Sequence, residues 1–234
     1  MAKFYKSKNH YLLEQDVKYM AYSMLVLLLP VVLLWVVYKL LPIGWTFVGI
    51  VVFLLFLFKL SEPIVDFFKR KAGRFFRGWK GERHIKTILR ELPDDWSVFE
   101  DVVLPGKRGD IDFVIVGPTG VYILEVKAHG GVIGYNGYAL TVNGKMFRDK
   151  DFLRQTHGQL RRLKDFLYAK TGHSVYINAA VVFANDYATT HFGYEPLGGI
   201  YVLQKEFVLG LFHHFPNQLN LPRTAIESAL GAVH

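Results

Sequence analysis

Two long apolar runs near the N-terminus constrain this chain more than any other feature. Residues 19–38 (YMAYSMLVLLLPVVLLWVVY) and residues 40–58 (LLPIGWTFVGIVVFLLFLF) contain no charged side chain. A helix rises about 1.5 Å per residue, so a run of about 20 residues crosses the roughly 30 Å hydrocarbon core of a bilayer. Lys39 is the only charge between the two runs. The sequence therefore predicts a transmembrane helical hairpin with almost no exposed loop.

The flanking charges predict the orientation of this hairpin. Four lysines precede it, and residues 59–90 contain ten Lys or Arg against three acidic residues. A signal peptide would be shorter and would not be followed by a second span, and helices buried in a soluble core are rarely apolar on every side. Basic flanks stay in the cytoplasm. We therefore expect a two-pass protein of the inner (cytoplasmic) membrane of a bacterium, with both termini and the soluble domain cytoplasmic.

The composition suggests five segments along the chain. We expect a cytoplasmic N-terminal segment over 1–18, the transmembrane hairpin over 19–60, a basic juxtamembrane connector over 61–77, a soluble domain over 78–204 and a C-terminal helical extension over 205–234. The connector alternates aromatic and basic residues. This pattern fits either a helix lying on the inner membrane surface or a helix packed on the soluble domain.

The net charge of +8 indicates an acidic partner, either nucleic acid or anionic lipid. The positive-inside rule explains part of this excess, so the charge alone does not identify DNA. The chain has no cysteine, and its nine histidines form no HExxH or other zinc-like spacing. We therefore expect neither disulfides nor a zinc site.

Residues beyond the connector predict an α/β domain around a mixed sheet. Helices are expected over 81–91, 151–170, 205–215 and 223–233, and strands over 96–104, 111–116, 121–126, 175–183 and 199–203. A small hairpin is expected around the Asn143-Gly144 turn. A helix followed by strands, another helix and further strands is typical of this fold class.

The stretch GDIDFVIVGPTGVYILEVK, residues 109–127, carries the strongest functional signal. Two β-forming runs flank a GPTG turn, in which Pro and Thr are expected to be the central residues. That turn places Asp112 opposite Glu125 and Asp110 opposite Lys127, all on one face. The other face carries the side chains of Ile111, Phe113, Ile115, Tyr122, Leu124 and Val126, which suit a core.

Two opposed carboxylates repel one another unless a cation lies between them. Mg²⁺ prefers a few carboxylate oxygens, with waters and phosphate oxygens completing its shell, and Asp112 and Glu125 suit that role. Lys127 could then hold or activate the attacking water, or stabilise the transition state. The alternative is an ordinary sheet end, where Lys107, Arg108 and Lys127 form surface ion pairs of little energetic consequence.

A series of short motifs gives this region a family resemblance. A Gly-Glu pair opens the first helix, a Leu-Pro-x-x-Trp break ends it, and Gly-Asp-Ile-Asp, Gly-Pro-x-Gly and Glu-x-Lys follow in order. Residues 78–185 thereby resemble the NERD, or nuclease-related, domain of the PD-(D/E)xK nuclease superfamily. The resemblance implies a restriction-endonuclease-like fold, with a central mixed sheet flanked by helices. One departure is that Ile111 replaces the proline of the superfamily's Pro-Asp pair.

The resemblance also implies roles for individual residues. Asp112 and Glu125 would bind Mg²⁺ (or Mn²⁺), Lys127 would be the catalytic lysine, and Glu82 would be a first-helix acid aimed at the metal or its water. Gln155 would position the phosphate or the water.

The residues themselves leave alternatives for two of these roles. Glu82 equally fits an acid placed in the first turn of a helix, where it interacts favourably with the helix dipole. Gln155 equally fits a solvated helix position, and Gln159, one turn later, competes for its role.

The leading hypothesis is a membrane-anchored, metal-dependent nuclease that hydrolyses phosphodiester bonds of nucleic acid, with DNA as the expected substrate. The candidate phosphate contacts are the basic residues around the helix over 151–170, namely Lys145, Arg148, Lys150, Arg154 and Arg161, with Arg162 and Lys164 beside them. On that helix, Arg161 and Arg162 equally fit a solvated face. The alternatives are a non-catalytic membrane tether that binds nucleic acid or a protein through the same fold, and a lipid-binding scaffold.

Overall fold

The computed structural model describes most of the chain outside the two apolar runs. The described residues are 1–6, 28, 32, 35, 36, 39, 49–56, 59, 78–106, 109–147, 151–215, 219 and 221–233. The chain divides into two compact units, one of Met1–Lys8 with Phe76–His234 and the other of Asn9–Phe75. Within the described residues, no helix is both long and apolar enough to cross a bilayer. Most of the expected hairpin and all of the connector over 61–77 lie outside the described residues.

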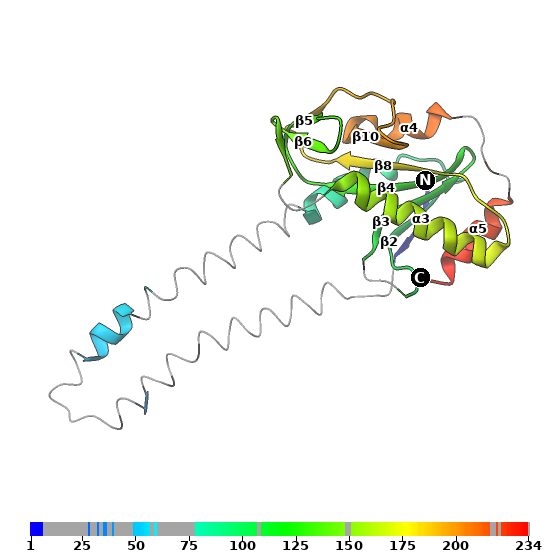
Figure 1. The fold of residues 1–234 in the computed structure, drawn as a ribbon. Coiled ribbons are helices and arrows are strands. Elements are labelled where there is room, and N and C mark those ends of the chain that lie inside the picture. Colours follow the sequence, from blue (N-terminus) through cyan, green and yellow to red (C-terminus); the bar gives the residue numbers. More distant parts are fainter. Residues whose placement is uncertain are drawn as a thin grey trace. The chain divides into compact units, whose positions relative to one another are not determined.

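A mixed sheet forms the centre of the first unit, as the sequence predicts (Figure 1). Its six strands within the described residues have the order β1 (Lys3–Lys6), β2 (Ser97–Val102), β3 (Ile111–Gly117), β4 (Gly120–Lys127), β8 (Ile177–Phe183) and β10 (Ile200–Gln204). The segment β2–β3–β4 is an antiparallel meander, whereas β1 joins β2 in parallel, and β4, β8 and β10 run parallel to one another.

A smaller sheet follows β4 in the chain. It has the order β7 (Lys145–Met146), β6 (Leu140–Val142), β5 (Gly131–Tyr135) and β9 (Ala188–Thr190) among the described residues. The expected hairpin is confirmed, because Val142 pairs with Lys145 across the Asn143-Gly144 turn. Asn143 and Gly144 have φ angles of 49° and 77°, which are the left-handed values of the two-residue turn that suits a twisted hairpin.

Helices cover both faces of the large sheet. One face packs on α3 (Phe152–Thr171) and α5 (Arg223–Gly231), which lie side by side (Figure 1). The other face packs on the helix over residues 78–89 and on α4 (Val208–His214), which follows the short η1 (Lys205–Phe207). Asp151 caps α3 by accepting the Arg154 backbone N–H, and Gly172 ends the helix in a left-handed conformation.

The register of the β3–β4 hairpin is the one that the GPTG turn predicts. Gly117 pairs with Gly120, and the ladder continues to Phe113 opposite Leu124. The expectation that Ile111 shares a core face with Phe113 and Ile115 is wrong, because Ile111 packs in the same core cluster as Val114, whereas Phe113 and Ile115 pack in the other. Asp101 on the neighbouring strand has a φ of 51°, and the β2–β3 pairing skips it. Asp112, the residue opposite Asp101 on β3, is skipped as well, and beyond Phe113 the residues of β3 no longer alternate between the two core clusters.

Strand β1 is the feature of the fold that local sequence patterns do not reveal. The Ala2 backbone N–H donates to the Leu92 carbonyl at 2.8 Å, and the Lys3 N–H donates to the Trp96 carbonyl at 2.9 Å. The Tyr5 ring stacks on Phe99 with 4.7 Å between centroids. The first residues of the chain therefore complete the sheet of the unit that resumes at Phe76, on the far side of the Asn9–Phe75 unit in sequence.

The C-terminal residues also belong to this unit. Val208, Leu211 and Phe212 of α4 are fully buried in one core cluster, and Ile226 and Leu230 of α5 are fully buried in the other. Residues 205–233, which sequence patterns alone set apart as an extension, thus supply side chains to both faces of the sheet.

Candidate active site

The candidate site lies at the end of the β3–β4 ladder, where the pairing of the two strands stops. The last paired residues are Phe113 and Leu124, so Asp112 and Glu125 occupy the next opposed positions. There the Asp112 carboxylate accepts the Val126 backbone N–H at 2.6 Å. A side chain thus satisfies a backbone donor just beyond the last paired residues of the hairpin. This bond anchors one carboxylate against the strand that carries the other.

Glu125 accepts from three side-chain donors, one on its own strand β4 and two on α3. Its side chain is buried, with the residue only 3% exposed. Glu125 Oε1 forms an ion pair with Lys127 Nζ and accepts Gln155 Nε2 at 2.5 Å, while Oε2 accepts Gln159 Nε2. Both carboxylate oxygens are therefore bonded, which compensates for the cost of burying the charge.

Gln155 and Gln159, the two candidates for positioning the phosphate or the water, both donate hydrogen bonds to the Glu125 carboxylate. Their spacing of four residues places them on one face of α3, and that face lies over the sheet. Gln159 is buried and also donates to the Asp110 carbonyl at 3.0 Å. Gln155 Oε1 lies 3.5 Å from Lys127 Nζ. Gln155 therefore contacts the two charged groups, whereas Gln159 fixes the loop before β3 to the site.

The helix over residues 78–89 brings Glu82 to the same place. A Cβ on Gly81 would lie 3.3 Å from Ala184 Cβ and 3.5 Å from Val126 Cγ1. Glycine at this position thus allows the helix backbone to approach the ends of β4 and β8 closely. The next residue, Glu82, is within electrostatic reach of Glu125 and Lys127.

Burial and neighbouring carboxylates raise the pKa of two acids of the site, Glu82 and Asp112. Burial, and then the charges of Asp101, Asp110 and Glu125, raise the pKa of Glu82 to about 7. Burial, followed by the charges of Glu125 and Glu82, raises the pKa of Asp112 well above its ordinary value. Lys127 acts in the opposite direction on both groups but does not cancel the effect. The site therefore has an excess of negative charge.

The donor chemistry of these side chains suits Mg²⁺, which binds carboxylate oxygens. Among the described residues, however, no group of three or more His, Cys, Asp or Glu side chains is arranged to hold a metal ion. Glu125 is bonded instead by Lys127 and the two glutamines. Asp112 and Glu125, with Glu82 nearby, are the residues of the site whose oxygen donors would suit a metal ion.

The expected phosphate contacts are only partly within the described residues. Arg148 and Lys150 lie outside them, and Lys145 is exposed on β7. Arg154 and Arg161 are exposed on α3. The neighbouring cations have local partners, because Arg162 donates to the Gly158 carbonyl and Lys164 lies over the Tyr176 ring. The exposed cations on α3 belong to the same helix as the two glutamines of the site.

A known protein family matches part of this chain. Neither the curated proteins nor the solved structures include a match to the chain. The model of one protein family does match, and the matched region contains Glu82, Asp112, Glu125, Lys127 and Gln155. That family is NERD, the nuclease-related domain, and it matches residues 77–184.

Proposed function

We propose that this protein is a membrane-anchored, metal-dependent nuclease that hydrolyses phosphodiester bonds of DNA. The observation that carries the proposal is the pair Asp112 and Glu125, which occupy facing positions on adjoining strands with Lys127 bonded to Glu125. Such a pair needs a cation to offset its repulsion, and the raised pKa of Asp112 is the expected consequence.

Each side chain has a distinct role in this proposal. Asp112 and Glu125 would hold Mg²⁺ (or Mn²⁺), and Glu82 would bind the ion or a water in its shell. A bound divalent ion acidifies a water molecule and offsets charge on a phosphate. Lys127 would orient the attacking water near the carboxylates, and Gln155 would position the water or a phosphate oxygen. Gln159 holds the Glu125 carboxylate in place.

The exposed cations around α3 supply the expected path for a polyanion. Lys145, Arg154 and Arg161 are exposed in the structure. Lysine and arginine bind phosphates without reading base sequence, so these residues support binding of nucleic acid irrespective of sequence.

The anchor is the apolar pair of runs over 19–38 and 40–58. Strand β1 lies before the runs and pairs with β2 after them. Two strands can pair only in the same compartment, so this pairing supports a hairpin whose two ends emerge on one side of the membrane. With the basic flanks, it supports a cytoplasmic domain on the inner membrane of a bacterium.

One observation, the set of hydrogen bonds that the Glu125 carboxylate accepts, favours a second function. Both of its oxygens are bonded by protein side chains, an arrangement that also suits a site without metal. The protein would then be a non-catalytic membrane tether that binds nucleic acid or a protein through the same fold.

Cleavage of DNA by the full-length chain in detergent distinguishes the two functions. We expect cleavage with Mg²⁺ and none with EDTA. Asp112→Asn and Lys127→Met should each lower the cleavage rate by about 10²-fold or more, since each removes a group that acts on the reacting phosphate. DNA affinity should persist in both variants.

The matched control is Asp165→Asn, an exposed carboxylate on α3 ten residues after Gln155. It removes the same charge from the same region and should leave the cleavage rate unchanged. Binding of DNA without Mg²⁺-dependent cleavage would support the tether, and cleavage that survives Asp112→Asn would exclude the proposed site.

A further inference from the structure

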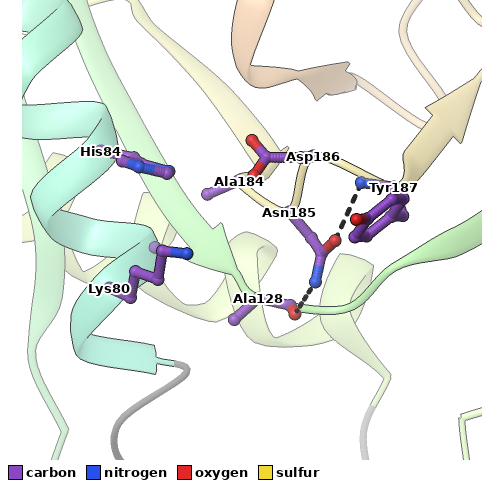
Figure 2. Close-up of a pocket in the computed structure, with 8 residues that line it drawn as sticks. Lys80, His84, Ala128, Ala184, Asn185, Asp186 and Tyr187 are labelled. Atoms are coloured by element: carbon purple, nitrogen blue, oxygen red, sulfur yellow. Dashed lines mark hydrogen bonds between the residues drawn. The ribbon is translucent and has the colours of Figure 1, made fainter.

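A small pocket lies beside the candidate active site. Figure 2 shows Lys80 and His84, on the helix over 78–89, pointing toward the loop that carries Asn185, Asp186 and Tyr187. Its volume is about 160 Å³. Sites for whole small molecules are usually about 300–1,000 Å³, so this pocket suits a single small group.

The wall of the pocket is held in a fixed shape. Asn185 Nδ2 donates to the Ala128 carbonyl at 3.1 Å, and Asn185 Oδ1 accepts the Tyr187 backbone N–H at 2.9 Å (Figure 2). Both polar groups of this side chain are therefore engaged in shaping the loop.

The remaining polar groups favour an anion. Lys80 and His84 line the pocket as donors. Asp186 also lines it, but its carboxylate forms an ion pair with Lys205. That bond with Lys205 holds the pKa of Asp186 below its ordinary value, and the charges of His84 and Lys80 act in the same direction. Because Lys205 is bonded to this carboxylate, Lys80 and His84 remain as the donors that line the pocket.

The pocket and the candidate site share backbone. The Ala184 N–H donates to the Lys127 carbonyl at 2.9 Å, and both Ala184 and Ala128, the residue after Lys127, line the pocket. Gly81 lines it as well, directly before Glu82. A strand whose scissile phosphate lies at Asp112 and Glu125 would therefore carry neighbouring phosphates close to Lys80.

We propose that this pocket binds a backbone phosphate of the nucleic-acid substrate, next to the phosphate that is cleaved, with Lys80 and His84 as its donors. The assignment rests on the proposed nuclease function and adds a position on the substrate strand. Its single phosphate contact carries no base specificity.

The test measures binding without cleavage. Full-length protein carrying Asp112→Asn is purified in detergent, and its affinity for a fluorescent DNA oligonucleotide is measured by anisotropy at several salt concentrations. Lys80→Ala should weaken binding and lower the slope of log affinity against log salt by about 0.9 for duplex or about 0.7 for single-stranded DNA, the value for one phosphate contact. His84→Ala should also weaken binding, and Asp186→Asn should strengthen it.

The matched control is Arg90→Ala, which removes one positive charge from an exposed position ten residues after Lys80, about 15 Å along a helix axis. Its slope should equal that of the parent. Equal slopes for Lys80→Ala and Arg90→Ala would overturn the pocket assignment, while leaving Mg²⁺-dependent cleavage by the unmodified chain as separate evidence for the nuclease. A parent protein that binds no DNA at low salt would overturn both.

Discussion

Glu82 is a residue of the candidate site whose negative charge lowers the stability of the fold. Its neighbours Asp101, Asp110 and Glu125 are all acidic, and together with burial they raise its pKa to about 7. A carboxyl whose folded-state pKa exceeds its ordinary value of 4.5 binds protons more tightly in the folded protein than in the unfolded chain. Ionisation of Glu82 therefore destabilises the fold as the pH rises from about 4.5 to about 7.

Replacing Glu82 with Gln should stabilise the metal-free protein at high pH. One pKa unit corresponds to about 1.4 kcal/mol, so the free energy of unfolding at pH 8 should increase by about 1–3 kcal/mol. Near pH 4 the glutamate is protonated in both states, so the variant and the parent should be equally stable. Unfolding monitored by tryptophan fluorescence in EDTA measures this difference. A difference that does not change between pH 4 and pH 8 would contradict the electrostatic explanation.

At the scale of elements, β1 adds residues from before the apolar runs to the domain that follows them. It forms the edge of the large sheet and lies next to β2 in parallel. Parallel strands need a crossover between them, and here the intervening chain includes the whole Asn9–Phe75 unit. A fragment that starts at residue 78 lacks this strand, so activity tests belong on the full-length chain.

Lys3→Pro should destabilise the domain, because proline has no N–H to donate to the Trp96 carbonyl. The loss of this bond, with the Trp96 carbonyl left unpaired, should cost about 1–3 kcal/mol in the free energy of unfolding. Lys3→Ala is the matched control, since it removes the same charge and keeps the N–H. Thermal unfolding of the full-length proteins measures both, and equal midpoints would show that β1 contributes little to stability.

The whole molecule combines a compact unit built from both ends of the chain with an intervening unit over Asn9–Phe75. The apolar runs fall entirely within the intervening unit, and β1 and the candidate site fall entirely within the other. This division predicts that membrane attachment and folding of the unit that contains the candidate site can be separated by one replacement.

Replacing residues 9–75 with a flexible linker should release the protein from the membrane. A Gly/Ser linker of about 20 residues has a root-mean-square span of about 25 Å and keeps residues 1–8 on the chain for pairing with β2. Fractionation should find the full-length chain in the membrane pellet after carbonate extraction and the linker variant in the supernatant. A linker variant that remains in the pellet would contradict the assignment of the anchor to 9–75.

The sequence alone predicts some features of the candidate site and not others. Asp112 and Glu125 could be placed opposite each other, because a short turn fixes the register of a hairpin and the intervening residues alternate regularly. Gln159 could be identified only as a competitor of Gln155, since spacing on a helix does not reveal which residues face the sheet and lie close enough to bond. The pocket beside Lys80 could not be predicted, because its two walls lie about a hundred residues apart.

The sequence by itself determined the features that depend on neighbours in the chain: two apolar runs of membrane length, alternating strands, the turn that aligns the two carboxylates, and the helix that follows. Only the tertiary structure decided which distant elements meet. It joined β1 to β2, placed both C-terminal helices in the core and brought two glutamines to one buried carboxylate. The local periodicity of the sequence specifies the length of a helix or strand and which of its faces is apolar. Which other element that face packs against depends on the packing of the whole chain.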